Sequence, residues 1–273
     1  MTVRGRVVVV TGGASGIGRA LARRFHREEA ASIVVADLDG DGAAQVAREI
    51  GGIGVRTDVR VESEVVALIE RAEREAGPID LFCSNAGVFM AGGLDTPDGV
   101  WDTMWEVNFR SHLYAARHLV PRMAARGGGS LLFTASAAGL LAQIGSVTYS
   151  VTKHAAVALA EWISIHHGGA GIQVSVLCPQ AVRTAMTAGH EESVASVDGM
   201  LDPEVVADAV IEGLEKERFL ILPHPEVAEY ARRRAENPDR WLAGMRRLRD
   251  RYAGGRTRDS ESRGSEPEGG RTR

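Results

Sequence analysis

Short runs of branched apolar residues alternate along this chain with longer segments of helical periodicity, and this alternation constrains the fold most strongly. The apolar runs lie at 7–10, 33–36, 53–55, 79–82, 131–133, 174–177 and 219–222. Their nearly continuous hydrophobicity is typical of strands buried on both faces of a sheet. Between two of them, Val65, Leu68, Ile69 and Ala72 follow the spacing of one helix face. The sequence therefore predicts an α/β fold, a doubly wound parallel sheet of about seven strands with helices on both faces.

A glycine-rich loop follows the first predicted strand and precedes a helical segment that starts near Arg19. It reads Thr-Gly-Gly-Ala-Ser-Gly-Ile-Gly and spans residues 11–18. Glycines permit positive φ angles and close approach of the backbone to a ligand, and a helix N-terminus attracts an anion such as pyrophosphate. The strand–loop–helix context indicates a Rossmann-type nucleotide site, and a plain tight turn is the alternative interpretation.

An acidic residue, Asp37, ends the second predicted strand about 20 residues beyond the glycine loop. A carboxylate there accepts hydrogen bonds from the ribose hydroxyls of a dinucleotide and repels the 2′-phosphate of NADP. The loop contains no arginine or lysine, and none follows Asp37 immediately. The sequence therefore predicts NAD as the cofactor. The alternative interpretation is that Asp37 only ends a strand, in the turn at 37–40.

Tyr149 and Lys153 open a long helical segment, and the four-residue spacing puts them on one helix face. A nearby ammonium stabilises a phenolate and lowers the tyrosine pKa, as a general acid/base requires. Chance also produces this spacing, with a packed aromatic beside a solvated lysine. Ser136 strengthens the catalytic interpretation, because it follows a predicted strand at the edge where open α/β sheets bind ligands.

Taken in order, these motifs resemble the short-chain dehydrogenase/reductase family, in its compact single-domain branch. The resemblance covers residues 5 to about 222 and rests on the loop at 11–18, Asp37, Asp58-Val59, Asn85-Ala86-Gly87, Asn108, Ser136 and Tyr149-x-x-x-Lys153. It implies an NAD-dependent oxidoreductase that interconverts a secondary alcohol and a ketone by hydride transfer. It also implies a homo-oligomer, a dimer or tetramer, to which the apolar residues Trp162, Ile163 and Ile165 are suited.

The resemblance assigns expected roles to individual residues. Tyr149 is the expected acid/base and Ser136 polarises the substrate oxygen. Lys153 lowers the tyrosine pKa and holds the nicotinamide ribose, and Asn108 supports a water that relays protons. The residues implied in cofactor binding are Gly12, Ser15, Gly16, Ile17, Gly18, Asp37, Asp58, Val59, Asn85, Ala86, Gly87, Tyr149, Lys153, Pro179, Val182 and Thr184.

Two positions depart from the family pattern. Ser84 stands where the family often has asparagine, a change expected to alter sheet hydrogen bonding only slightly. Gln180 follows Pro179 where the family usually has glycine, beside the expected nicotinamide position. We hypothesise that Gln180 narrows the active site or binds substrate.

The substrate is expected to be a fairly hydrophobic small molecule. Apolar residues gather at 88–90 and 140–144, and the variable substrate loop is expected over residues 184–200. Gln143, Gln180 and Met186 are the candidate substrate contacts. The same residues would also suit packing on one another, and His190 in the loop suits a solvated position.

Three other functions fit parts of the pattern. A 3-oxoacyl-thioester reductase shares the motifs, but it is expected to use NADPH, which Asp37 opposes. A sugar-nucleotide epimerase or dehydratase usually carries a longer substrate domain. A non-catalytic NAD-sensing protein commonly lacks the tyrosine or the lysine, and this chain has both.

Composition and charge limit the partners and the cellular location that can be expected. The net charge of −4 gives no reason to expect nucleic acid, and no apolar run approaches the ~18 residues of a membrane span. The N-terminus has no signal-peptide pattern, so a cytoplasmic protein is expected. The two cysteines, Cys83 and Cys178, lie in apolar runs and suit the core better than a disulfide or a reactive thiol. No metal site is predicted.

The C-terminal part changes character after Pro223. Residues 225–252 contain eight arginines and five acidic residues and predict one or two helices. We expect a single NAD-binding and catalytic domain over residues 1–252, with this helical extension from about 225. Residues 253–273, which lack large apolar groups, are expected to form a disordered tail.

Overall fold

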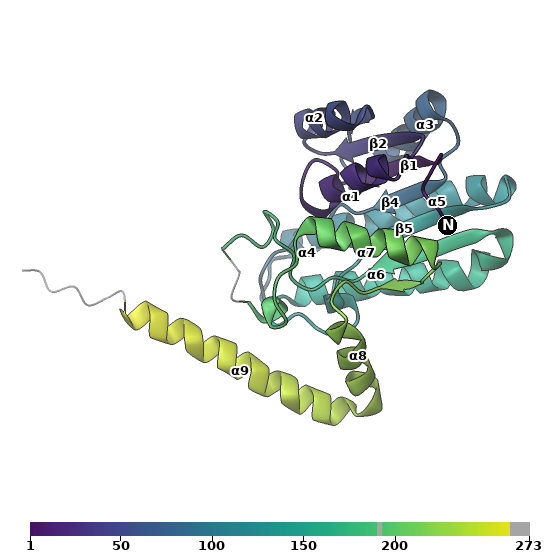
Figure 1. Cartoon of the computed structure of the whole chain (residues 1–273). Helices are drawn as coiled ribbons and strands as arrows, with labels where there is room; N and C mark the ends of the chain where they lie inside the picture. The colour runs from purple at the N-terminus through teal and green to yellow at the C-terminus, as the bar shows by residue number, and fades with distance from the viewer. Residues whose placement is uncertain (190–192, 263–273) are drawn as a thin grey trace, which may run out of the picture.

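The computed structural model describes residues 1–189 and 193–262, with the side chains of 253–262 left undescribed. Over this part of the chain, seven strands form one parallel sheet in the order β3-β2-β1-β4-β5-β6-β7 (Figure 1). The strands are β1 (Val7–Thr11), β2 (Ser32–Asp37), β3 (Ile53–Arg56), β4 (Leu81–Ser84), β5 (Gly129–Thr134), β6 (Ile172–Leu177) and β7 (Leu220–Ile221). The strand order reverses between β1 and β4, so the predicted doubly wound sheet is confirmed.

Helices cover both faces of this sheet. One face carries α1 (Gly16–Arg27), α2 (Gly40–Ile50) and α7 (Pro203–Glu215), and the other carries α3 (Glu62–Ala76), α5 (Ser111–Ala125) and α6 (Val147–His167). A further helix, α4 (Asp98–Trp105), leads into α5. Crossover helices on both faces are what a parallel sheet requires.

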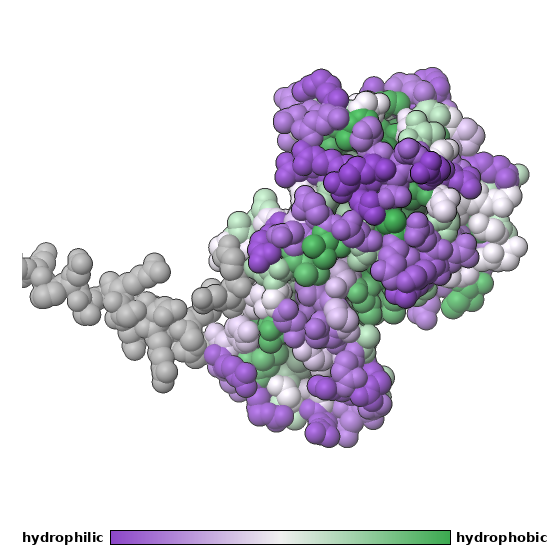
Figure 2. Space-filling model, in the orientation of Figure 1, coloured by the Kyte–Doolittle hydropathy of each residue, from purple (hydrophilic) through white to green (hydrophobic). Residues whose placement is uncertain are grey.

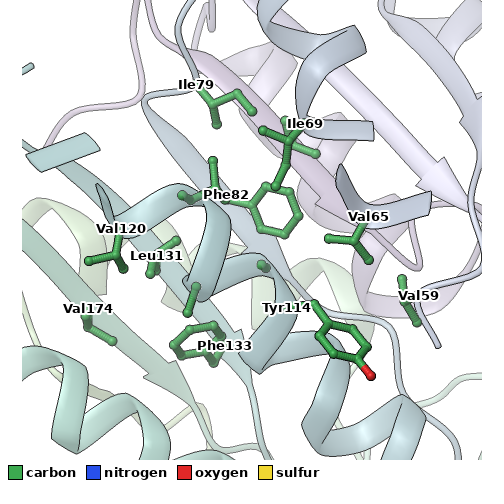
Figure 3. Close-up of a cluster of buried hydrophobic side chains, with 14 of the residues drawn as sticks. Val59, Val65, Ile69, Ile79, Phe82, Tyr114, Val120, Leu131, Phe133 and Val174 are labelled. Carbon is green, nitrogen blue, oxygen red and sulfur yellow. The ribbon is translucent and has the colours of Figure 1, made fainter. Parts of the chain in front are cut away.

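The pleat of each strand divides the core between the two faces. In β1, Val9 packs toward α3 and α5, whereas Val8 and Val10 pack toward α1 and α2. Figure 3 shows the α3–α5 side, where side chains from the helices meet those of β4, β5 and β6. Cys83 and Cys178 are buried and unpaired, as the core interpretation predicts, and burial raises the pKa of the Cys178 thiol to about 12.

Small shifts separate predicted and observed element boundaries. Strand β4 begins at Leu81, because the Asp80 carboxylate accepts a hydrogen bond of 2.9 Å from the Val7 backbone N–H. Helix α7 begins at Pro203, and the Asp202 side chain before it accepts from Arg183 at 3.0 Å and does not cap the helix.

The C-terminal extension consists of two helices, α8 (Glu226–Glu236) and α9 (Pro238–Ser262). Pro238 separates them, since proline has no N–H to continue α8. Figure 1 shows α9 extending away from the rest of the molecule. Helix α9 continues ten residues past Tyr252, into the segment expected to be disordered, and no proline interrupts it there. The rest of the expected tail, 263–273, lies outside the described residues.

One face of the molecule is largely polar. On the face shown in Figure 2, hydrophilic side chains dominate and hydrophobic ones form small groups. Among the described helices, none combines the length and apolar character needed to cross a membrane.

Candidate active site

A cleft of about 2290 Å³ opens at the carboxyl edge of the sheet. It is lined by Ser136, Tyr149 and Lys153, by the sixteen residues predicted to bind the cofactor, and by all three candidate substrate contacts, Gln143, Gln180 and Met186. Asn108 is fully buried and does not line the cleft. The segments that contribute lie far apart in the sequence, and the parallel sheet brings their ends together.

The glycine loop joins β1 to α1 and forms a backbone cradle. A Cβ on Gly18 would lie 2.0 Å from the Gly12 carbonyl oxygen, so this position admits only glycine. In the described part of the chain, the N-cap residue Ser15 makes no side-chain hydrogen bond to the first turn of α1, which carries no acidic residue. The N–H groups of this turn therefore fit the pyrophosphate of a dinucleotide.

Asp37 lies at the end of β2, beside this cradle. Its carboxylate accepts hydrogen bonds of 3.0 Å from the backbone N–H groups of Ala14 and Asp39. Asp37 thus braces the glycine loop and lines the cleft at the same time. Each carboxylate oxygen can accept more than one hydrogen bond, so this bracing leaves capacity for ribose hydroxyls.

Asp58 and Asn85 define the next part of the wall. The Asp58 carboxylate accepts from the guanidinium of Arg60 at 2.6 Å, which holds the pKa of Asp58 below its usual range. The Asn85 amide donates to the Thr11 carbonyl at 3.0 Å and accepts from the Thr134 hydroxyl at 3.0 Å. Asn85 therefore ties the ends of β1, β4 and β5 together.

The predicted catalytic residues converge at the start of α6. Ser146 caps this helix by accepting a hydrogen bond of 3.2 Å from the Tyr149 N–H, which places Tyr149 in the first turn. The Ser136 hydroxyl lies close enough to Tyr149 to lower its pKa. One turn along, Lys153 Nζ lies 5.6 Å from the centre of the Tyr149 ring and donates to the Thr134 carbonyl at 2.9 Å.

Asn108 lies in a π-helical turn (Glu106–Arg110) between α4 and α5. Its amide accepts from the Val88 N–H and donates to the Val88 carbonyl, both at 2.9 Å. A Cβ on Gly87 would lie 3.3 Å from Asn108 Oδ1 and 3.5 Å from Lys153 Nζ. Asn108 Oδ1 and Lys153 Nζ therefore both lie beside Gly87, so Asn108 is close to the group it is expected to assist. Turns of this kind often occur at functional sites.

Comparison with known proteins agrees with this geometry. The sequence profile of the short chain dehydrogenases matches residues 6–195 of the chain. The chain belongs to the short-chain dehydrogenase family. It is an oxidoreductase that acts on hydroxyl groups and uses a nicotinamide cofactor.

Individual relatives span most of the chain. It is 36% identical over 240 residues to a 1-deoxy-11-beta-hydroxypentalenate dehydrogenase of Streptomyces exfoliatus, covering 83% of this chain and 86% of that one. A 3beta-hydroxysteroid dehydrogenase 2 of Eggerthella lenta is 33% identical, over 69% and 75% of the two chains. A short-chain dehydrogenase/reductase of Burkholderia phymatum, solved in complex with NAD, superposes with a TM-score of 0.81 at 29% identity, over 88% and 96% of the chains.

In this dehydrogenase, burial has the largest effect on the pKa values of Lys153 and Tyr149. It lowers the pKa of Lys153 to about 8. Burial also raises the pKa of Tyr149, an effect that the Ser136 hydroxyl partly offsets. The raised pKa of Tyr149 is opposite to the lowered pKa that the spacing of Tyr149 and Lys153 predicts. The reason is that both side chains are withdrawn from water and the Lys153 ammonium is engaged by a backbone carbonyl.

The substrate side of the cleft is lined by both apolar and polar side chains. Val88, Phe89, Leu141 and Ile144 line it, whereas Leu140 packs into the core and Met90 does not contribute. The Gln143 amide donates to the neighbouring Ile144 carbonyl at 3.2 Å, and Met186 is 41% exposed. His190, in the predicted substrate loop, lies outside the described residues.

Three residues near the site were not predicted from the sequence. Arg60 pairs with Asp58 and lines the cleft. Buried His112 accepts or donates at Nδ1 to the Ser84 hydroxyl, 2.7 Å away, and its pKa is lowered to about 3 by burial and then by the charge of Lys153. His224 accepts from the Gln180 backbone N–H at 3.2 Å. The four-residue spacing from Asn108 was the available signal for His112.

Among the described residues, no group of three or more histidine, cysteine, aspartate or glutamate side chains is placed to hold a metal ion.

Proposed function

We propose that this dehydrogenase interconverts a fairly hydrophobic secondary alcohol and its ketone with NAD(H) as cofactor. The observation that carries the proposal is the convergence of Ser136, Tyr149 and Lys153 at one end of the cleft. The three residues come from segments that are separate in the sequence. Such a hydroxyl–phenol–ammonium group is suited to proton exchange with a substrate oxygen.

Each side chain of this group has a distinct task. Tyr149 takes the hydroxyl proton of the alcohol during oxidation and returns it during reduction. The Ser136 hydroxyl holds the same oxygen, and the Lys153 ammonium stabilises the phenolate while the proton is absent. The nicotinamide ring, when bound, accepts or supplies the hydride. Asn108 holds the backbone of Val88, which lines the cleft.

The preference for NAD is supported by the charge at the end of β2. Asp37 lines the cleft, its neighbour Leu38 is apolar, and the nearby Arg60 is engaged by Asp58. The 2′-phosphate of NADP would therefore lie beside the Asp37 carboxylate. The Arg60 guanidinium would not be free to neutralise it, because Arg60 is paired with Asp58. Asp37→Asn retains an acceptor for Ala14 and removes the charge. We expect it to reduce the NAD over NADP ratio of kcat/KM by about 10-fold or more, since each 1.4 kcal/mol is a factor of ten.

Asp39→Asn is the matched control for that charge. Asp39 accepts from the Gly42 N–H at 3.0 Å as the cap of α2, and it does not line the cleft. A cofactor ratio that falls equally in both variants, or in neither, would contradict the role of Asp37.

The hydrophobic substrate is supported by the lining of the cleft and by the relatives. Val88, Phe89, Leu141 and Ile144 line the same cleft as Tyr149, and the Phe89 ring centre lies 5.2 Å from that of Tyr149. Two relatives are named for a hydroxypentalenate and a hydroxysteroid. We expect cyclic apolar alcohols to be better substrates than phosphorylated or strongly charged ones.

A panel of secondary alcohols and ketones, assayed with NAD(H) and NADP(H) at the nicotinamide absorbance, tests this function. Tyr149→Phe removes the proton-exchanging oxygen and is expected to lower kcat by about 100-fold or more. Its NAD affinity should stay within about twofold of wild type, because the substitution leaves the glycine loop and Asp37 unchanged. Tight NAD binding without turnover across the whole panel would favour a sensor, and retained activity in Tyr149→Phe would refute the assignment.

We also propose that the protein is a homotetramer assembled partly through α6. Trp162 and Ile165 are 53% and 71% exposed and lie three residues apart on one face of that helix, where they offer apolar surface to a second copy. Ile165→Arg should shift the sedimentation coefficient toward that of a smaller species. An unchanged coefficient would exclude this face from the interface.

A further inference from the structure

The C-terminal extension contacts the turn that follows Ser136. This segment is a single 3-10 helical turn (Ala137–Gly139), and the Ser136 hydroxyl caps it by accepting a hydrogen bond of 3.1 Å from the Ala138 N–H. Helix α8 packs on the turn through a hydrophobic cluster that contains Ala137, Leu141, Val227 and Tyr230. The family profile matches residues 6–195, so α8 lies beyond it. The support of this turn therefore comes from a part of the chain outside the matched segment.

One arginine of α8 points inward at this contact. The Arg234 guanidinium donates from Nη1 to the Leu140 carbonyl, at the end of the 3-10 turn, and to His154 Nε2 in α6 at 3.2 Å. The preceding residue, Arg233, pairs instead with Glu229 of its own helix at 2.6 Å. Arg234 therefore joins three segments, namely α8, the turn after β5 and the first part of α6.

The hydrogen bonds of His154 agree with this arrangement. A guanidinium only donates, so His154 Nε2 is the acceptor and a ring proton lies on Nδ1. This Nδ1 donates in turn to the Ser150 carbonyl at 2.8 Å, one turn earlier in α6. Both ring nitrogens thus have a partner. His154 directly follows Lys153, so Arg234 is attached to the helix turn that carries the lysine of the site.

The 3-10 turn lies directly on the backbone of α6. A Cβ on Gly139 would lie 2.6 Å from the Lys153 carbonyl oxygen, so the two backbones are in close contact there. Leu140 ends the turn, where a backbone carbonyl has no partner within the helix. Arg234 supplies that partner and binds α6 through His154 at the same time. Its side chain therefore holds the turn against α6.

We propose that Arg234 is a positioning residue for the dehydrogenase reaction and that it acts through Ser136. The inference rests on the proposed function, in which the Ser136 hydroxyl and the Tyr149 phenol reach the same substrate oxygen. By holding the turn against α6, Arg234 sets the distance between these two groups, since Tyr149 belongs to α6. Arg234 does not line the cleft, so it touches no reacting atom. A displacement of about 1 Å in such a group lowers a rate by up to about 100-fold.

Arg234→Met tests the proposal, because it removes the donors and keeps a long unbranched side chain. With NAD and either cyclohexanol or decalin-2-ol, we expect kcat to fall by about 10-fold while KM changes by less than about twofold. The NAD dissociation constant should also stay within about twofold. Arg234→Lys retains a cationic donor and should recover kcat to within about threefold of wild type.

A double-mutant cycle tests whether Arg234 acts through Ser136. In the Ser136→Ala background, Arg234→Met is expected to lower kcat by less than about twofold, because the hydroxyl that it positions is already absent. Independent losses that multiply to the same 10-fold decrease in that background would overturn the proposal. So would an unchanged kcat in Arg234→Met alone.

Arg126→Met is the matched control. Arg126 also donates to a backbone carbonyl, that of Ile79, and it pairs with Glu73 at 3.1 Å. Ile79 precedes β4, at the edge of the sheet opposite the cleft. Arg126→Met should therefore lower the unfolding temperature without changing kcat. An equal loss of kcat in both variants would show that only stability is affected, and the positioning role is then rejected.

Hydrogen exchange of the NAD complex separates failure of this inference from failure of the proposed function, since it needs no substrate. The Leu140 and Leu141 N–H groups donate to the Ala137 carbonyl within the turn. In Arg234→Met they should exchange about 10-fold faster, and in Arg126→Met at the wild-type rate. Unchanged exchange in Arg234→Met rejects the inference while the dehydrogenase function stands. Faster exchange in a protein whose wild type oxidises neither alcohol confirms the contact, but rejects the proposed function and the positioning role with it.

Discussion

The cofactor wall and the substrate wall of the cleft differ in what defines their shape. The cofactor wall is formed by residues 11–18, 37 and 85–87, at the carboxyl ends of adjacent strands β1, β2 and β4. Its shape is a property of the backbone, since Gly18 has no room for a Cβ. The substrate wall is formed by side chains such as Gln180 and Tyr230, which come from segments about 50 residues apart.

This difference separates binding of the common cofactor from selection of the substrate. A backbone-defined wall is sensitive to any added atom, but it offers few positions at which specificity can be altered. The side-chain wall can change its hydrogen-bonding groups without moving the sheet. We therefore expect substitutions on the first wall to alter cofactor affinity, and those on the second to alter the choice of alcohol.

Gly18→Ala tests the cofactor wall most severely. The added Cβ would lie 2.0 Å from the Gly12 carbonyl, so the loop must move and the N–H groups of α1 lose their alignment. We expect NAD affinity to fall by about 100-fold or more, measured by fluorescence or calorimetric titration. Gly168→Ala is the control, because nothing lies within 4 Å of its Cβ position at the end of α6. Unchanged affinity in Gly18→Ala would contradict a backbone-defined wall.

Lys153 lies where the two walls meet, and its protonation links stability to pH. With its pKa lowered to about 8 by burial, the folded protein releases this proton at a lower pH than the unfolded chain does. Stability therefore rises between about pH 8 and 10.5, in the range where only the unfolded chain still binds the proton. Relative to Lys153→Met, the wild type should gain about 3 kcal/mol in free energy of unfolding over this range.

Urea unfolding of the two proteins at pH 7.5 and at pH values up to 10 measures this gain. Tyr149 has a raised pKa and opposes the gain only near and above its ordinary value of 10. If the free energy of unfolding depends on pH in the same way in the wild type and in Lys153→Met, burial does not lower the pKa of Lys153.

The two walls also differ in how far the sequence alone predicts them. The glycine loop, Asp37 and the Tyr149–Lys153 pair are local patterns, each fixed by one strand end or one helix turn, and residues of all three line the cleft. His224 and Asp198 have no local pattern, because their partners are Gln180 and Tyr230, 44 and 32 residues away. Contacts at that separation depend on how α7 and α8 pack.

Charge states were predicted less well than positions. The spacing of Tyr149 and Lys153 indicates a shared helix face, but it contains no information on how deeply the two are buried. Burial then decides the direction of both pKa shifts. The π-helical turn at Asn108 was missed for a related reason, since its hydrogen bonds to Val88 join segments 20 residues apart.

Trp241 lies at the outer rim of the substrate wall, and its substitution is expected to have the smallest effect of those considered. Its ring centre lies 6.4 Å from that of Tyr230, and it packs against the small cluster formed by Ala137, Leu141 and Val227. Trp241→Ala removes apolar surface that is only partly buried, so we expect KM for a bulky alcohol to rise by about 3- to 10-fold. NAD affinity and the KM for a small alcohol should stay unchanged, because neither reaches this rim. Measuring both KM values together with the NAD dissociation constant separates the outcomes. Loss of NAD affinity would mean that α9 supports the cofactor wall as well, and that the two walls are not independent.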